Sequence, residues 1–160
     1  MTTAFDRWTD SNIRFVFGFD ATKNRISLAK DQDEKMYKEL VRRAVRIPQT
    51  ATRTKPPRVK DEIIEKRGFK VTHLESEQVV EFEYTPIACK KIYRVIALRK
   101  NLSIRKSGVE ISKEIRYFFY ITNDWKLTQD EVVHEANQRC NQENLIQQLK
   151  TGIRALHAPV

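Results

Sequence analysis

Apolar residues along this chain follow two different periods, which predict a strand-rich middle between more helical regions. The short run 13–19 is apolar and aromatic, as in a buried strand. From residue 69 the period becomes two, and apolar residues alternate with glutamates in 80–84. The segments 91–99 and 114–122 are rich in β-branched and aromatic residues, which favour strands. We therefore predict an α+β fold in which 69–122 is rich in strands.

Helical spacing is found on either side of that middle. Apolar residues recur at helical intervals in 31–45, which predicts an amphipathic helix that ends before Pro48. The segment 49–60 contains Pro56-Pro57 and is predicted to be an exposed basic loop. A short helix is expected in 61–68, because acids stand at its start, bases at its end and glycine after it.

A longer helix is predicted for 128–150. Thr128 and Glu131 have the spacing of a capping box, in which each side chain accepts a hydrogen bond from the backbone N–H of the other residue. No residue between 128 and 150 breaks a helix, and Gly152 is placed as a stop. At about 100° per residue, Arg139, Glu143 and Lys150 project within roughly 40° of one another. From spacing alone, solvated ion pairs are the more common explanation of such a stripe.

Positive charge is concentrated in two blocks of the sequence. The formal net charge is +9, and the pI near 9.7 favours polyanionic partners such as nucleic acid. Residues 41–70 carry 10 basic and 3 acidic side chains, and residues 90–106 carry 7 basic side chains and no acidic one. Charge runs are often only solvated surfaces, so individual phosphate contacts are hypotheses. The candidates are Arg53, Lys55, Arg58 and Lys60 in the loop, and Lys90, Lys91, Arg94, Arg99 and Lys100 on the strands.

The sequence contains few other residues that could form a catalytic or metal-binding site. Cys89 and Cys140 form no CxxC pair, so buried free thiols are the simplest interpretation. The three histidines are dispersed and are interpreted as structural or surface residues. No apolar run approaches the roughly 20 residues that span a bilayer, so we expect a cytoplasmic protein without a membrane partner.

The stripe in the last helix also resembles a family signature. The pattern R-x3-E-x6-K, preceded by YFFYITND, is similar to that of bacterial insertion-sequence transposases of DDE (Asp-Asp-Glu) group 1. Further blocks, from FDRW and RFVFGFDA to IRALHAPV, resemble the same family over nearly the whole chain. The resemblance implies a partial ribonuclease-H-like core with its core strand near 13–19 and its catalytic helix at 128–150. The region 20–122 would then be an insertion that holds the basic loop and the strands.

The resemblance also implies roles for the three residues of the stripe. Glu143 would be the catalytic glutamate and a ligand to Mg²⁺ or Mn²⁺ in the complete enzyme, which transfers phosphoryl groups with two metal ions. Arg139 and Lys150 would bind DNA phosphates on either side of the scissile bond. Three residues before the arginine, Ala136 stands where the wider family has a tyrosine, so the resemblance does not extend to the aromatic or hydroxyl contact that this tyrosine would make with DNA.

Both aspartates of the family would precede Met1, so residues 1–160 are expected to be a fragment of one catalytic domain. Asp6, Asp10 and Asp20 match no family position, and surface or turn roles are expected for them. One carboxylate holds Mg²⁺ poorly, so no metal is expected to bind firmly and the isolated chain is expected to be catalytically incompetent. The expected partner is transposon-end DNA, with intact transposase or a second copy of the chain as further partners. The alternative is a non-catalytic DNA-binding or regulatory module that pairs with intact transposase.

Overall fold

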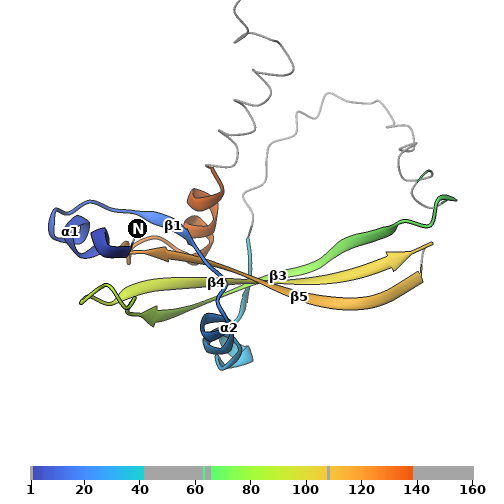
Figure 1. Ribbon diagram of the computed structural model, residues 1–160, viewed down its shortest axis with the longest axis horizontal. Coiled ribbons are helices and arrows are strands. Elements are labelled where there is room, and N and C mark those ends of the chain that lie inside the picture. Colours follow the sequence, from blue (N-terminus) through green and yellow to red (C-terminus); the bar gives the residue numbers. More distant parts are fainter. Residues whose placement is uncertain (1, 42–62, 64–65, 108, 139–160) are drawn as a thin grey trace, which may run out of the picture. The chain divides into compact units, whose positions relative to one another are not determined.

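The computed structural model describes residues 2–41, 63, 66–107 and 109–138 (Figure 1). These residues form an antiparallel five-stranded sheet with helices, which confirms the predicted α+β class. The strand order in the sheet is β1-β5-β4-β3-β2. The strands are β1 (Val16–Phe19), β2 (Lys38–Glu39), β3 (Lys70–Tyr84), β4 (Tyr93–Lys106) and β5 (Val109–Thr122). The helices are η1 (Thr2–Ala4), α1 (Phe5–Asp10), α2 (Lys23–Lys30), η2 (Glu34–Met36) and the segment 129–138.

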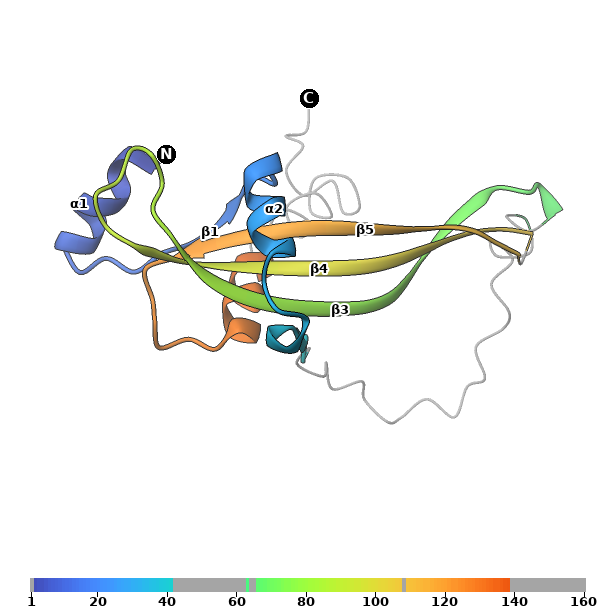
Figure 2. The same ribbon diagram turned by 90° about the horizontal axis from the view of Figure 1, so that it is seen from below.

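The three long strands β3, β4 and β5 confirm the predicted strand-rich middle, and they run side by side (Figure 2). Each is longer than its predicted segment, because the pattern in 80–84, 91–99 and 114–122 marks only the apolar parts. The chain turns from β4 to β5 at Ser107, which has a positive φ of 50°.

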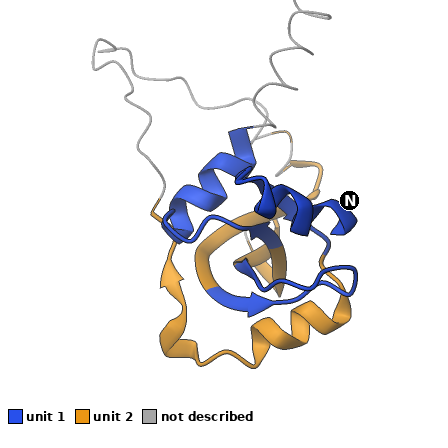
Figure 3. Cartoon of the chain, turned by 90° about the vertical axis from the view of Figure 1, so that its left-hand side faces the viewer, with its two compact units in different colours: residues 1–20, 81–97, 119–160 blue, residues 21–80, 98–118 orange. Residues whose placement is uncertain are grey.

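The chain divides into two compact units (Figure 3). The first contains 1–20, 81–97 and 119–160, and the second contains 21–80 and 98–118. Each long strand therefore passes from one unit into the other. The region 81–97, which lies in the middle of the predicted insertion, belongs to the same unit as β1.

An aromatic cluster forms the core of the first unit. Phe5 of α1 is 1% exposed, and its ring centroid lies 4.5 Å from that of Phe15 and 5.6 Å from that of Tyr93. Phe17 and Trp8 complete the cluster. Antiparallel pairing of β1 with β5, from Val16 opposite Thr122 to Phe19 opposite Phe119, places the strand expected near 13–19 beside this core.

The core of the second unit forms where the segment after α2 meets β3 and β4. Val79 and Leu98 are fully buried or nearly so. The buried Tyr37 donates its hydroxyl hydrogen bond to Ala29 O (2.7 Å), and the guanidinium carbon of Arg99 lies 3.9 Å from the centroid of the Tyr37 ring. These contacts attach the segment that follows α2 to the sheet.

The predicted helix at 31–45 is wrong over its described part. Residues 31–41 form a turn, the 3₁₀ helix η2 and the strand β2, in which Lys38 stands opposite Val79. The physical reason is tertiary, because burial of Tyr37 and pairing with β3 outweigh a weak local helical preference. The remainder of that prediction, and the basic loop 49–60, lie outside the described residues.

The structure also describes part of the short helix predicted at 61–68 and the side chain of Cys89. In the short helix predicted at 61–68, Ile63 and Lys66 are helical, and Gly68 has a φ of 63°, which suits a helix stop. Cys89 is a buried free thiol, as expected, and its Sγ donates to Thr2 O at 3.2 Å. Among the described helices, none is long and apolar enough to cross a bilayer.

Candidate nucleic-acid interface

A loop held by polar contacts connects β5 to the helix at 129–138. Asp124 is 6% exposed, and its Oδ2 lies 3.3 Å from Nη1 of Arg14. Its Oδ1 accepts a hydrogen bond from the Lys126 N–H (2.8 Å), and its own N–H donates to Thr122 Oγ1 (3.0 Å). The end of β5 and the first residues of the loop are therefore held in one arrangement.

Arg94 supports the same loop from β4. Its Nε donates to Glu81 Oε2 at 2.8 Å, and its Nη1 donates to Asp124 O (3.4 Å) and to Leu127 O. The side chain is 8% exposed. The charge pattern of the sequence predicts that Arg94 contacts DNA phosphates. In the structure, its guanidinium instead forms hydrogen bonds with groups of the first unit.

The helix begins with the predicted capping box, which the structure confirms. The Thr128 N–H donates to Glu131 Oε2 at 2.9 Å, and the Glu131 N–H donates to Thr128 Oγ1 at 3.3 Å. Val132 and Val133 are buried, and they anchor the first turn of the helix. The start of the helix is therefore fixed both by its cap and by apolar packing.

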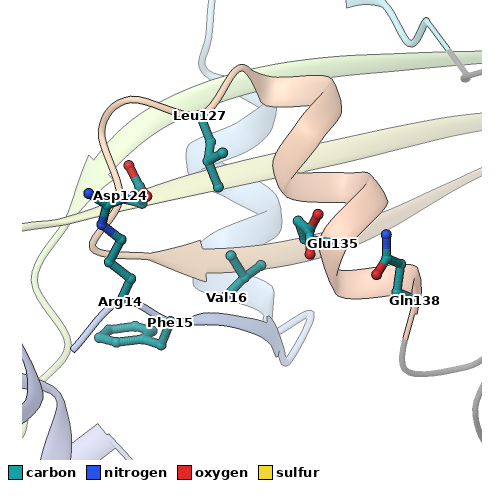
Figure 4. A pocket seen from close by; sticks show the side chains of 7 residues that line it. All are labelled: Arg14, Phe15, Val16, Asp124, Leu127, Glu135 and Gln138. Carbon is teal, nitrogen blue, oxygen red and sulfur yellow. Dashed lines mark ion pairs between the residues drawn. The ribbon is translucent and has the colours of Figure 1, made fainter.

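An open pocket of about 450 Å³ lies beside this helix (Figure 4). Asp124 in its wall is already paired with Arg14, whereas Glu135 is exposed. No group of three or more metal-binding side chains is found within the described residues. The residues that line the pocket are Arg14, Phe15, Val16, Asp124, Leu127, Glu135 and Gln138.

Most of the predicted site residues lie outside the part of the chain that the structure describes. This applies to the stripe of the last helix and to the basic loop. The residues concerned are Arg139, Glu143 and Lys150, together with Arg53, Lys55, Arg58 and Lys60.

Lys90 and Lys91, two of the described candidates, lie in the first unit beside α1. Their backbone N–H groups donate to the Asp6 carboxylate at 2.7 and 3.3 Å, and the Lys91 ammonium pairs with Asp10. The Lys90 side chain is exposed to solvent. Of these two candidates, Lys90 is therefore the one whose position suits a phosphate contact.

Asp6 has a structural role as the acceptor for this segment. In addition to the two N–H groups, the Tyr93 hydroxyl donates to Asp6 Oδ1 at 2.7 Å. The hydrogen bond from the Lys90 backbone, followed by that from Tyr93, lowers the pKa of Asp6 below its ordinary value. Burial raises the pKa of Tyr93 to about 12, and its hydrogen bond to Asp6 acts in the same direction.

Arg99 and Lys100, the other described candidates, form ion pairs within the second unit. Arg99 donates to both carboxylate oxygens of Glu34 (2.6 and 2.7 Å) and to Gln78 Oε1 (2.8 Å). Lys100 Nζ lies 3.1 Å from Glu77 Oε1 and 5.0 Å from the centroid of the Phe118 ring. Both side chains are held by carboxylates of their own unit, which reduces their availability to DNA phosphates.

A group of four other cations is better placed for phosphates. β3 begins where β4 ends, and a Cβ atom at Gly68 would lie only 3.4 Å from Cε of Lys106. All four side chains are exposed, and within the described residues none has a carboxylate within ion-pair distance. We call this group the tip cluster; its members are Lys66, Arg67, Lys70 and Lys106.

The tip cluster joins the two basic blocks of the sequence. Lys66, Arg67 and Lys70 come from the end of the first block, and Lys106 from the end of the second. Sequence reasoning identified both blocks but not these members, because only the pairing of β3 with β4 brings their ends together. An exposed group of this kind is suited to backbone phosphates, which carry no sequence information.

Comparison with known proteins found no matching family model, curated protein or solved structure.

Proposed function

We propose that this chain is part of the catalytic core of a DDE transposase, in which Glu143 is one of the carboxylate ligands of the divalent metal ions. The observation that carries this proposal is the R-x3-E-x6-K pattern in the sequence, which begins directly after the described helix 129–138. The capped start of this helix is joined by a short loop to the buried end of β5. The proposal includes a ribonuclease-H-like core, of which β1, the end of β5 and the helix at 129–138 are the described elements.

The described start of the helix supports this reading of the pattern. Glu135 lies in the pocket wall, four residues before Arg139. If the helix continues as the sequence predicts, Arg139 and Glu143 are rotated from Glu135 by only about 40° and 80°. The two residues would then project from the side of the helix that carries Glu135.

Each residue of the stripe has a distinct proposed role. Bound Mg²⁺ or Mn²⁺ would activate the attacking water or 3′-hydroxyl and stabilise the leaving oxygen. Glu143 would hold metal, and Arg139 and Lys150 would orient the DNA strand through its phosphates. In this proposal the two aspartates are supplied by sequence outside these 160 residues, because Asp6, Asp10 and Asp20 match no position of the family pattern.

The tip cluster supports a second part of the proposal, which is that the second unit holds DNA. Its four exposed cations would bind backbone phosphates without reading bases. This part is shared with the alternative function, a non-catalytic DNA-binding or regulatory module that pairs with intact transposase. The two functions differ in whether the protein cuts DNA.

The catalytic proposal can be tested in a reading frame extended upstream through two aspartates. With Mg²⁺ and labelled transposon-end DNA, the extended protein is expected to cut the DNA. Loss of a metal ligand removes several kcal/mol of transition-state stabilisation, so Glu143→Gln is expected to reduce the rate by about a hundredfold or more.

The matched control is Glu135→Gln, which removes the same charge from the same helix but leaves the pattern intact. This variant is expected to keep its activity. Equal cutting by the wild-type and Glu143→Gln proteins would refute the metal-binding role, and Mg²⁺-dependent cutting by the 160-residue chain alone would refute the need for outside aspartates.

A further inference from the structure

Over residues 109–118, the outer side of β5 is a strand edge that no other described strand covers. β1 pairs with β5 only from Phe119 to Thr122, and β4 occupies the other side of β5. Within the described residues, no strand pairs with 109–118 on the outer side, and β5 lies at the margin of the three long strands (Figure 2). A strand edge of this length presents backbone N–H and C=O groups to which another strand can bind.

The side chains along this edge are unusually apolar for an exposed strand. Val109, Ile111 and Ile115 are 67, 51 and 55% exposed. Because residues two apart in a strand point to the same face, these three side chains lie on one face together with Lys113 and Tyr117. Apolar side chains grouped beside an open edge favour association over solvation.

We propose that this edge pairs with the same edge of a second copy of the chain, antiparallel and about a two-fold axis. Residues that stand opposite each other in an antiparallel pair point to the same face, so the two residue numbers in each pair must add to an even number. β1 already occupies the positions from 119 onward. The longest register that avoids β1 therefore places Val109 of one copy opposite Tyr117 of the other.

This register is complementary in its side chains. Ile111 stands opposite Ile115, and the symmetry makes each pair occur twice. Glu110 stands opposite Arg116, whose guanidinium already pairs with Glu114 of its own strand at 2.7 Å, so Glu110 would be a second carboxylate beside it. The next shorter allowed register, in which the two strands are shifted by two residues, would place Glu110 opposite Glu114. These two carboxylates would repel each other. The one unfavourable contact is Lys113 with its own copy at the axis, and Glu110 of the same strand lies 3.8 Å from Lys113.

A pocket lies at the end of the edge, where the second copy would meet it. It has a volume of about 530 Å³ and is formed by α2 and by residues 115–118 of β5. Tyr117 is one of its lining residues, so the proposed register brings Val109 of the second copy to this pocket. The α2 residues that line it are Ile26 and Lys30.

Cysteine cross-linking tests the register directly in the full chain. In a Cys140→Ser background, Lys113→Cys is expected to form a disulfide-linked dimer under mild oxidation, because opposite Cα atoms lie about 5 Å apart. Ser112→Cys is the matched control. In the proposed register, Ser112 of the second copy is displaced along the strand by about two residues from Ser112 of the first. The Cα atoms of the two residues are then separated by about 8 Å, which is too far for a disulfide.

The mass of the chain in solution tests the association itself. Sedimentation of the wild-type chain over the micromolar range is expected to show a dimer. The double variant Ile111→Lys/Ile115→Lys is expected to weaken dimerisation by about tenfold or more. The control Ile13→Lys/Ile92→Lys changes two equally exposed isoleucines of the first unit and is expected to remain dimeric.

Two results would overturn the proposal. One is a wild-type chain that stays monomeric throughout this range. The other is a dimer in which Ser112→Cys cross-links as readily as Lys113→Cys, since that would place a different surface at the axis. Neither result depends on DNA or metal, so both are independent of the proposed transposase function.

Discussion

The Phe5 ring contacts the rings of Trp8, Phe15, Phe17 and Tyr93, and Phe5 is almost fully buried. Truncation of a buried phenylalanine removes its packing and leaves a cavity. We therefore expect Phe5→Ala to reduce the free energy of unfolding by about 3 to 5 kcal/mol, as measured by urea unfolding.

The control for this prediction is Phe69→Ala, because the Phe69 side chain is 54% exposed. Its truncation is expected to change the free energy of unfolding by less than about 0.5 kcal/mol. If the two variants were equally stable, the aromatic cluster would not be the core of the first unit.

The contacts of Asp6 make the stability of the chain dependent on pH. Because the folded state lowers the pKa of Asp6 below its ordinary value of 3.8, the ionised carboxylate stabilises the fold at neutral pH. This contribution is fully present above pH 3.8 and is lost as the pH falls through the lower pKa of the folded state. The variant Asp6→Asn is therefore expected to have a lower Tm than the wild type at neutral pH, and the difference is expected to shrink in acid.

Thermal unfolding followed by circular dichroism between neutral and acidic pH measures this difference. The control is Asp10→Asn, which removes one exposed ion pair with Lys91 and is expected to have a smaller effect on Tm. A constant difference in Tm between the wild type and Asp6→Asn at every pH would contradict the proposed cause.

At the scale of the element, the capping box fixes where the helix at 129–138 begins. Thr128→Ala removes the acceptor for the Glu131 N–H and one partner of the Glu131 carboxylate. We expect a loss of about 1 kcal/mol in the free energy of unfolding, measured by urea titration, whereas Thr128→Ser is expected to retain most of it. A loss in Thr128→Ser as large as that in Thr128→Ala would show that the hydroxyl does not act as the cap.

The sequence predicts the elements unevenly, for physical reasons. The middle strands are predictable because their buried parts, 93–98 in β4 and 119–122 in β5, are rich in β-branched and aromatic residues, whereas 80–84 in β3 alternates apolar residues with glutamates. Their ends are not, since residues such as 70–76 are mostly exposed and are held by pairing with β4. α2 was missed because only Ala29 in it is buried, so it carries no apolar stripe. Over 31–41, the described part of the helix predicted at 31–45, the contacts of Tyr37 and the pairing of β2 with β3 replace the helix.

The candidate site was predictable in its composition but not in its arrangement. The excess of cations in two blocks indicates a polyanionic partner, yet sequence cannot show which cations are already paired. Arg94 and Arg99 are held by Glu81 and Glu34, respectively 13 and 65 residues away along the chain. The exposed tip cluster becomes visible only once β3 and β4 are paired.

At the scale of the whole molecule, the proposed function requires that the chain bind DNA through the tip cluster. The most direct measurement is the affinity for double-stranded DNA as a function of salt, by fluorescence anisotropy. The wild-type chain is compared with a tip variant, in which the four cations of the tip cluster are changed to glutamine. The control variant carries the same change at four exposed lysines elsewhere: Lys23, Lys35, Lys38 and Lys126.

Each phosphate contact makes the slope of log affinity against log salt steeper by about 0.9. The slope measured for the tip variant is therefore expected to be less steep than that of the wild type by about 3 to 4. The control variant, which has the same net charge, is expected to lose less than about 1. A wild-type affinity that does not fall with salt, or equal losses in the two variants, would contradict the account.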